Sequence, residues 1–115
     1  IDDELNIREL LAEYLTGKDF KVTHVGFAAE ARRVVKDDPP ALIITDLQLE
    51  DSDGLELVAE LKETLPDVPV ILLTGILFDP PVVAKMLGGK VSAYVPKTAA
   101  LAEILVEVRR LLPKQ

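Results

Sequence analysis

The sequence predicts an α/β domain with a doubly wound parallel sheet. Short runs of Val, Ile and Leu alternate along the chain with longer segments whose apolar residues follow helical spacing. Such alternation is typical of parallel sheets with helices on both faces. Hydrophobic residues make up 49% of the 115 residues and aromatic residues only 4%, so the core must be largely aliphatic. Aliphatic side chains are the usual filling of buried parallel strands.

The first predicted helix follows the chain start almost directly. Its apolar residues run from Leu5 to Leu15 with helical spacing, and Gly17 stands where a helix commonly ends. The alternation requires a strand before this helix, but only Ile1 precedes Asp2 and Asp3. We therefore expect the first strand to be truncated in this sequence, with N-terminal residues and a further domain after the last helix removed.

The remaining elements are predicted from apolar runs and from the turn residues between them. Runs too short for a helix and rich in β-branched residues predict buried strands, and amphipathic segments predict helices. Thr98 is a candidate N-cap of the last helix, which Pro113 ends. In chain order we predict a strand at 21–25, a helix at 28–36, a strand at 41–45, a helix from residue 54, a strand at 70–73, a helix at 82–87, a strand at 91–95 and a helix at 101–112.

Composition excludes several classes of site. The chain contains no Cys, so it has neither a disulfide framework nor a thiolate metal site. The formal net charge of −7 argues against a general nucleic-acid surface, which needs clustered Lys and Arg. No apolar run approaches the roughly 20 residues that span a bilayer. We expect a cytoplasmic protein.

Polar residues follow the predicted strands at their carboxyl ends, where doubly wound sheets bind ligands. Asp2 and Asp3 follow the first strand, and Asp46, Thr74 and Lys97 follow the three later strands. Carboxylates gathered at one edge repel one another, and a hard divalent cation such as Mg²⁺ relieves that repulsion. A carboxylate beside Mg²⁺ can attack phosphorus, while a lysine and a threonine stabilise phosphoryl oxygens.

Each of these residues also has an ordinary structural interpretation. Asp46 could cap the next turn, Asp2 and Asp3 could cap the first helix, and Thr74 and Lys97 could be a plain strand-end residue and a solvated lysine. His24 has no ligand cluster around it in the sequence, and we expect a structural or exposed side chain. The acidic run at 50–53 lacks the spacing of an EF-hand and is expected to be a solvated loop.

Four motifs occur in order, each at a strand end. They are Ile1-Asp2-Asp3-Glu4, Ile43-Ile44-Thr45-Asp46-Leu47 with Asp53-Gly54 downstream, Leu72-Leu73-Thr74-Gly75, and Ala93-Tyr94-Val95-Pro96-Lys97. In combination they make the chain resemble the receiver domain of two-component response regulators over essentially its whole length. The resemblance implies one receiver domain at 1–115, with a flavodoxin-like, five-stranded sheet in the order 2-1-3-4-5 and about five helices.

The resemblance also implies a metal site and a phosphoacceptor. Asp46 would accept a phosphoryl group from a histidine kinase or phosphotransfer protein. Asp3 would bind Mg²⁺ directly, Asp2 would assist through water, and the main-chain carbonyl of Gln48 would be a further ligand. The domain would assist its own phosphorylation and dephosphorylation but would not be an enzyme acting on external substrates.

The same resemblance implies a switch. Thr74 and Lys97 would contact the phosphoryl group, and Tyr94 would be the aromatic switch residue. Movement of Thr74 would let Tyr94 turn inward and change the face made by the fourth helix, fifth strand and fifth helix. The implied partners are an output domain or downstream protein, or a second copy of the chain, with no direct contact to nucleic acid or membrane.

The sequence departs from the family pattern in three places. Thr98 follows Lys97 where the family usually has a proline after a cis bond, so we expect a trans bond here. Pro80 and Pro81 limit the fourth helix to a late start. Glu50 replaces a common proline. These departures put the mechanics of the switch in doubt.

Two alternative functions follow from these observations. A degenerate receiver would act as an interaction module that is never phosphorylated. The presence of the acidic pair, Asp46, Thr74 and Lys97 argues against it, and the departures at Thr98 and at Pro80 and Pro81 keep it open. A phosphatase of the haloacid dehalogenase type also uses an Asp after a strand and Mg²⁺. That family has a second Asp two residues further on, where this chain has Gln48, and 115 residues leave no room for a cap domain.

Overall fold

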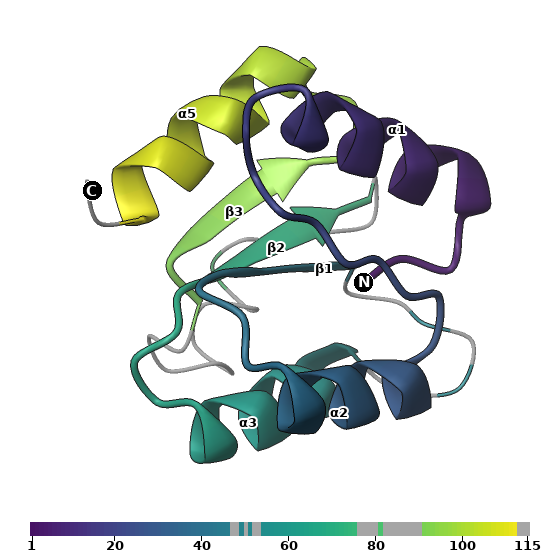
Figure 1. The fold of residues 1–115 in the computed structure, drawn as a ribbon, viewed down its shortest axis with the longest axis vertical. Coiled ribbons are helices and arrows are strands. Elements are labelled where there is room, and N and C mark those ends of the chain that lie inside the picture. Colours follow the sequence, from purple (N-terminus) through teal and green to yellow (C-terminus); the bar gives the residue numbers. More distant parts are fainter. Residues whose placement is uncertain (47–48, 50, 52–53, 76–80, 82–90, 113–115) are drawn as a thin grey trace.

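The computed structural model describes residues 1–46, 49, 51, 54–75, 81 and 91–112. Within this part, one parallel sheet contains β1 (Ile43–Asp46), β2 (Val70–Thr74) and β3 (Ala93–Pro96), in the order β1-β2-β3. The helices described are α1 (Leu5–Thr16), α2 (Ala28–Asp37), α3 (Gly54–Thr64) and α5 (Leu101–Leu111). Helices α1 and α5 cover one face of the sheet, and α2 and α3 cover the other (Figure 1). The predicted three-layer α/β arrangement is present.

The central strand β2 separates two hydrophobic cores. Val70 and Leu72 pack into the cluster formed with α2 and α3, whereas Ile71 and Leu73 pack into the cluster formed with α1 and α5. All four side chains are buried. Successive side chains of a strand point to opposite faces, so a strand covered on both sides must be apolar at every position. This explains why the strand is a continuous apolar run.

The N-terminal residues lie between β1 and residue 25. The Ile1 nitrogen donates to the Ile44 carbonyl at 2.6 Å, and the Asp46 N–H donates to the Ile1 carbonyl at 2.8 Å. On the other side, the Asp2 N–H donates to the Val25 carbonyl at 3.1 Å. Ile1 and Asp2 therefore occupy the place of the first strand in the order 2-1-3-4-5.

The prediction of a strand at 21–25 is wrong, because these residues form no regular strand. A ladder needs successive paired residues, whereas Asp2 makes a single backbone hydrogen bond to this segment, at the Val25 carbonyl. The predicted helix at 82–87 and Pro80 lie outside the described residues.

The segment before α5 also differs from the prediction. The helix begins at Leu101 after Ala100, so the predicted N-cap Thr98 is wrong. Thr98 is exposed in a turn in which the Ala99 N–H donates to the Pro96 carbonyl at 2.9 Å. No cis peptide bond occurs among the described residues, and the Lys97–Thr98 bond is therefore trans as expected. No helix in the described part is long and apolar enough to cross a membrane.

Candidate functional site

The carboxyl ends of the strands meet at one edge of the sheet. Each strand ends one residue later than predicted, so Asp46 and Thr74 are the last residues of β1 and β2. In the ladder Asp46 pairs with Leu73, and Thr74 pairs with Pro96. The Lys97 N–H then donates to the Thr74 carbonyl at 2.9 Å. The backbone ladder alone therefore brings Asp46, Thr74 and Lys97 together.

The Lys97 ammonium lies among three carboxylates. Its Nζ is 2.8 Å from Asp46 Oδ2, 2.8 Å from Glu4 Oε1 and 3.2 Å from Asp2 Oδ2. The side chains of Asp2 and Asp46 are only 3% and 7% exposed, whereas that of Glu4 is 58% exposed. The cluster therefore carries more negative than positive charge, and most of it is shielded from water.

The protonation of Lys97 reflects two opposing effects. Burial alone would lower the pKa of its ammonium group, because a charged amine loses hydration. Hydrogen bonds to the carboxylates of Asp46 and Glu4, together with the charge of Asp2, outweigh burial and raise the pKa of Lys97 above its ordinary value. Lys97 is therefore a fixed positive charge at neutral pH, as a group that stabilises phosphoryl oxygens must be.

The donor set fits a hard divalent cation. Carboxylate oxygens of Asp2, Glu4 and Asp46 lie within 4.8 Å of one another. Asp2 Oδ2 is buried and accepts no hydrogen bond from the described residues, although the Lys97 ammonium is nearby. A buried carboxylate oxygen without a donor is costly unless a cation compensates it. Oxygen ligands with excess negative charge are those that Mg²⁺ prefers.

The acidic residues near the chain start differ from the predicted set. Asp3 is half-buried and is not in the group formed by Asp2, Glu4 and Asp46, so its role as a direct ligand stays a prediction. Gln48, whose carbonyl was the other predicted ligand, lies outside the described residues. Glu4 was missed, although it is part of the first motif. Its place directly before α1 and its contact with Lys97 are the signals for it.

Asp2 does not cap α1, as one structural interpretation suggested. The N-cap residue is Glu4, and the helix has no side-chain cap hydrogen bond. Asp2 Oδ1 instead accepts the Glu4 N–H at 2.9 Å, ahead of the first residue of α1. This hydrogen bond holds the turn before the helix, while the second oxygen of Asp2 faces the cluster.

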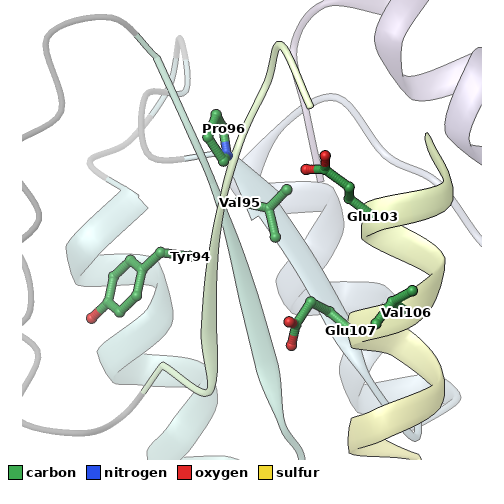
Figure 2. Close-up of a pocket in the computed structure, with 6 residues that line it drawn as sticks. All are labelled: Tyr94, Val95, Pro96, Glu103, Val106 and Glu107. Atoms are coloured by element: carbon green, nitrogen blue, oxygen red, sulfur yellow. The ribbon is translucent and has the colours of Figure 1, made fainter. Parts of the chain in front are cut away.

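Thr74 and Tyr94, the residues of the predicted switch, lie on the paired strands β2 and β3. Thr74 is buried, and its hydroxyl lies 3.5 Å from the Val95 carbonyl, at the outer limit of a hydrogen bond. Tyr94 is half-buried against the cluster that includes α2 and α3, and burial raises the pKa of its hydroxyl. Figure 2 shows the Tyr94 ring pointing away from Glu103 and Glu107 of α5.

Asp51 in the loop after β1 caps a helix. Its two carboxylate oxygens accept the backbone N–H groups of Ala28 (2.9 Å) and Ala29 (3.1 Å), in the first turn of α2. These hydrogen bonds lower the pKa of the Asp51 carboxyl below its ordinary value. Asp51 is exposed, but the prediction that this acidic run is merely solvated is incomplete, because Asp51 stabilises the N-terminus of α2.

Comparison with known families gives a match over almost the whole chain. The family model described as the response regulator receiver domain matches residues 1–109. The regulatory protein VirG of Agrobacterium fabrum is 35% identical over 111 residues, which cover 95% of this chain and 43% of VirG. The transcriptional regulatory protein CssR of Bacillus subtilis is 32% identical over 114 residues, 97% of this chain and 49% of CssR. The chain thus spans less than half of either relative.

Solved structures confirm the predicted fold class. The receiver domain of NtrX from Brucella abortus has a TM-score of 0.88 and 26% identity, and the match covers 99% of this chain and 96% of that structure. The signal receiver domain of a signal transduction histidine kinase from Syntrophus aciditrophicus has a TM-score of 0.84 and 32% identity, with 97% and 86% covered. The chain therefore has the flavodoxin-like, doubly wound fold that its sequence predicts.

Proposed function

The chain belongs to the response regulator receiver family, and from that membership in two-component signalling we propose that it accepts a phosphoryl group on Asp46. The donor is the phosphohistidine of a histidine kinase or phosphotransfer protein. The observation that carries this proposal is the contact of 2.8 Å between Lys97 Nζ and Asp46 Oδ2 at the carboxyl edge of the sheet. A buried carboxylate with a fixed ammonium at this distance is prepared for attack on a negatively charged donor.

The proposed step is an in-line transfer. A carboxylate oxygen of Asp46 attacks phosphorus, an O–P bond forms and the P–N bond of phosphohistidine breaks. The electron pair of that bond stays on the imidazole nitrogen, and the product is an acyl phosphate. Lys97 neutralises one phosphoryl oxygen, and the Thr74 hydroxyl donates to another. The long contact between Thr74 and Val95 means that this hydroxyl loses little when it turns toward the phosphoryl group.

We propose Mg²⁺ as the cofactor of this step. Asp2, Glu4 and Asp46 supply a carboxylate set that fits the ion. We retain Asp3 and the Gln48 carbonyl as predicted ligands. When bound, Mg²⁺ offsets the negative charge of the incoming phosphoryl group and of the carboxylates. Asp2 and Glu4 would contribute carboxylate ligands from the start of the chain. Asp46 alone would form the covalent bond.

Phosphorylation is proposed to change the surface around β3 and α5. The added charge of about −1.5 to −2 draws the Thr74 hydroxyl inward, and Tyr94 follows it. A pocket between β3 and α5 beside this tyrosine is lined by Tyr94, Val95, Pro96, Glu103, Val106 and Glu107 (Figure 2). Val106 is 63% exposed. We propose this face as the contact for an output domain, a downstream protein or a second copy of the chain.

The remaining predictions extend this proposal. Residues 1–115 act as one receiver domain in the cytoplasm, without direct contact to nucleic acid or membrane. The domain assists its own phosphorylation and dephosphorylation and does not turn over an external substrate. The relatives VirG and CssR are more than twice as long as the matched segment, which supports an output domain in the whole protein.

The test is intact-mass spectrometry after incubation with acetyl phosphate and Mg²⁺. We expect a phosphoryl adduct that disappears in EDTA and in Asp46→Asn, which keeps the shape of the side chain but removes the nucleophilic carboxylate. Asp51→Asn is the matched control, because it removes a carboxylate in the loop after β1 that binds the backbone of α2, and it should keep the adduct.

Other outcomes of this test identify the alternatives. If the folded protein gives no adduct with acetyl phosphate or with a purified histidine kinase, the chain is a degenerate receiver that acts as an interaction module. Steady release of phosphate from a generic phosphoester, at a rate abolished by Asp46→Asn, would instead indicate a phosphatase of the haloacid dehalogenase type.

A further inference from the structure

The Arg8 side chain, on α1, bonds to two residues outside the helix, Asp2 and His24. Its Nη1 donates to the main-chain carbonyl of Asp2 at 2.9 Å. Its Nε donates to Nδ1 of His24 at 3.1 Å. One guanidinium therefore holds Asp2 and the 24–26 segment at the same time, and the rigid fork of its donors fixes their separation. His24, predicted to be structural or exposed, is exposed and takes part in this link.

Gly26 provides the space for this guanidinium. A Cβ atom at residue 26 would lie 2.5 Å from Arg8 Nη1, closer than real Cβ contacts allow. The backbone of Gly26 does not have a left-handed φ, so the glycine is not required by backbone conformation. A side chain at this position would instead displace Arg8. The absence of a side chain at Gly26 thus leaves room for the Arg8 guanidinium.

Asp2 is held through its backbone on both sides. Its N–H donates to the Val25 carbonyl, and its C=O accepts from Arg8. Its side chain is thereby directed into the cluster with Asp46, where one of its oxygens has no hydrogen-bond donor among the described residues. The hydrogen bond from Arg8 therefore adds to the backbone hydrogen bonds that hold this part of the site.

We propose that Arg8, which lies in the space left by Gly26, is a positioning residue for the divalent cation. It holds the Asp2 carbonyl and so sets the affinity of the carboxylate cluster for the cation. The inference rests on the proposed function and deepens it. Arg8 donates to the Asp2 carbonyl and to His24, so its expected effect is on the geometry of Asp2. Residues that orient metal ligands from outside the ligand set change metal affinity by about 10- to 100-fold.

The experiment measures Mn²⁺ affinity by electron paramagnetic resonance of the free ion, and the Mg²⁺ dependence of adduct formation with acetyl phosphate. We expect Arg8→Met to raise the Mn²⁺ dissociation constant and the half-saturating Mg²⁺ concentration about 10-fold or more. The rate at saturating Mg²⁺ should change less than about 3-fold. Gly26→Ala, which displaces the guanidinium and leaves Arg8 in the chain, should shift both quantities in the same direction by a smaller factor.

Two further variants separate positioning from general stability. Arg8→Lys keeps one donor for the Asp2 carbonyl but not the link to His24, so it should recover part of the lost affinity. Arg32→Met removes an arginine that pairs with Glu60 across α2 and α3, and it should leave Mn²⁺ affinity unchanged. Urea denaturation of each variant establishes that it is folded, and Gly26→Ala provides the test if Arg8→Met does not fold.

Unchanged Mn²⁺ affinity in folded Arg8→Met and Gly26→Ala overturns the inference, as does a loss of rate at saturating Mg²⁺ with unchanged half-saturation. Failure of the proposed function is distinguished by the wild-type protein: it would then form no adduct at any Mg²⁺ concentration. The Mn²⁺ measurement does not require phosphorylation and still decides whether Arg8 sets the affinity of the cluster.

Discussion

The two halves of the site are held by different kinds of interaction. Asp46, Thr74 and Lys97 stand on or directly after β1, β2 and β3, and continuous parallel ladders fix their relative positions. Asp2 and Glu4 stand on a short segment that is held by separate hydrogen bonds, including those from Arg8 to Asp2 and from Asp46 to Ile1. Asp46, Thr74 and Lys97 are thus positioned by the sheet, whereas Asp2 and Glu4 are positioned by individual hydrogen bonds.

This difference indicates in which half of the site single substitutions should alter the geometry. A ladder is a cooperative structure backed by two buried cores, so single side chains at its edge do not decide its geometry. The segment that contains Asp2 and Glu4 is held by individual hydrogen bonds, so each side chain that holds it contributes separately. Lys97 joins the two halves, because its ammonium contacts Asp46 on one side and Asp2 and Glu4 on the other.

The largest effect on stability should come from the core under the ladders. Leu72 on β2 is fully buried, and Leu72→Ala should destabilise the domain by about 2–5 kcal/mol through lost burial and the cavity it leaves. Leu10→Ala on the 53%-exposed position of α1 is the matched control and should stay within about 0.5 kcal/mol. Urea denaturation measures both, and equal losses would contradict the division between core and surface.

The link between the halves should be the next most sensitive. Lys97→Met leaves Asp2 and Asp46 buried without their ammonium, and we expect a loss of roughly 1–3 kcal/mol in EDTA, below that of a fully buried pair because Glu4 is exposed. Mg²⁺ should restore more stability to this variant than to the wild type, since the cluster then carries one more uncompensated charge. Denaturation midpoints with and without Mg²⁺ measure this, and an equal Mg²⁺ effect in both proteins would argue against the cluster.

Asp51 should give a smaller effect that depends on pH. Because the folded state lowers the pKa of its carboxyl, the stabilisation is present above the ordinary Asp value of about 3.9 and is lost as the pH falls through the lowered value. Asp51→Asn should therefore be less stable than the wild type at pH 7, and the difference should shrink below about pH 4. Asp38→Asn, whose exposed carboxylate pairs with Lys21 at 3.8 Å, is the control and should show a weaker trend. A difference that is constant with pH would exclude the charged cap.

The smallest effect is expected at the surface between α2 and α3. Arg32 Nε lies 2.6 Å from Glu60 Oε2, but both side chains are about half exposed and the pair is screened by water. Arg32→Met should leave the denaturation midpoint in urea essentially unchanged at moderate salt. A loss comparable with that of Leu72→Ala would mean that this helix pair depends on charge more than on its buried side chains.

The half of the site on the ladders could be predicted from the sequence, because an apolar run followed by Asp46 or Thr74 marks a buried strand and its end. Parallel strands then bring these ends to one edge whatever the details of the loops. The strands at 41–45, 70–73 and 91–95 were each predicted to end one residue early, because Asp46, Thr74 and Pro96 do not continue the apolar run that marks each strand.

The half of the site that contains Asp2 and Glu4 could not be predicted in the same way. Its geometry depends on side-chain contacts between residues far apart in sequence, such as those of Arg8 with His24 and of Lys97 with Glu4. Spacing contains no signal for such pairs. Residues 21–25 have the composition of a strand but form no regular strand, so composition alone did not decide the local structure. Glu4 was missed because its exposed position gives it no periodic signature.

The contact between Lys97 and Asp2 joins residues that are 95 positions apart in the sequence. During synthesis the acidic segment emerges from the ribosome first, and its counter-charge emerges only after the helices and strands between them. The carboxylate cluster therefore gains its compensation only after most of the chain has been synthesised. A nascent chain that is stopped before residue 97 has the acidic residues without the lysine that compensates them.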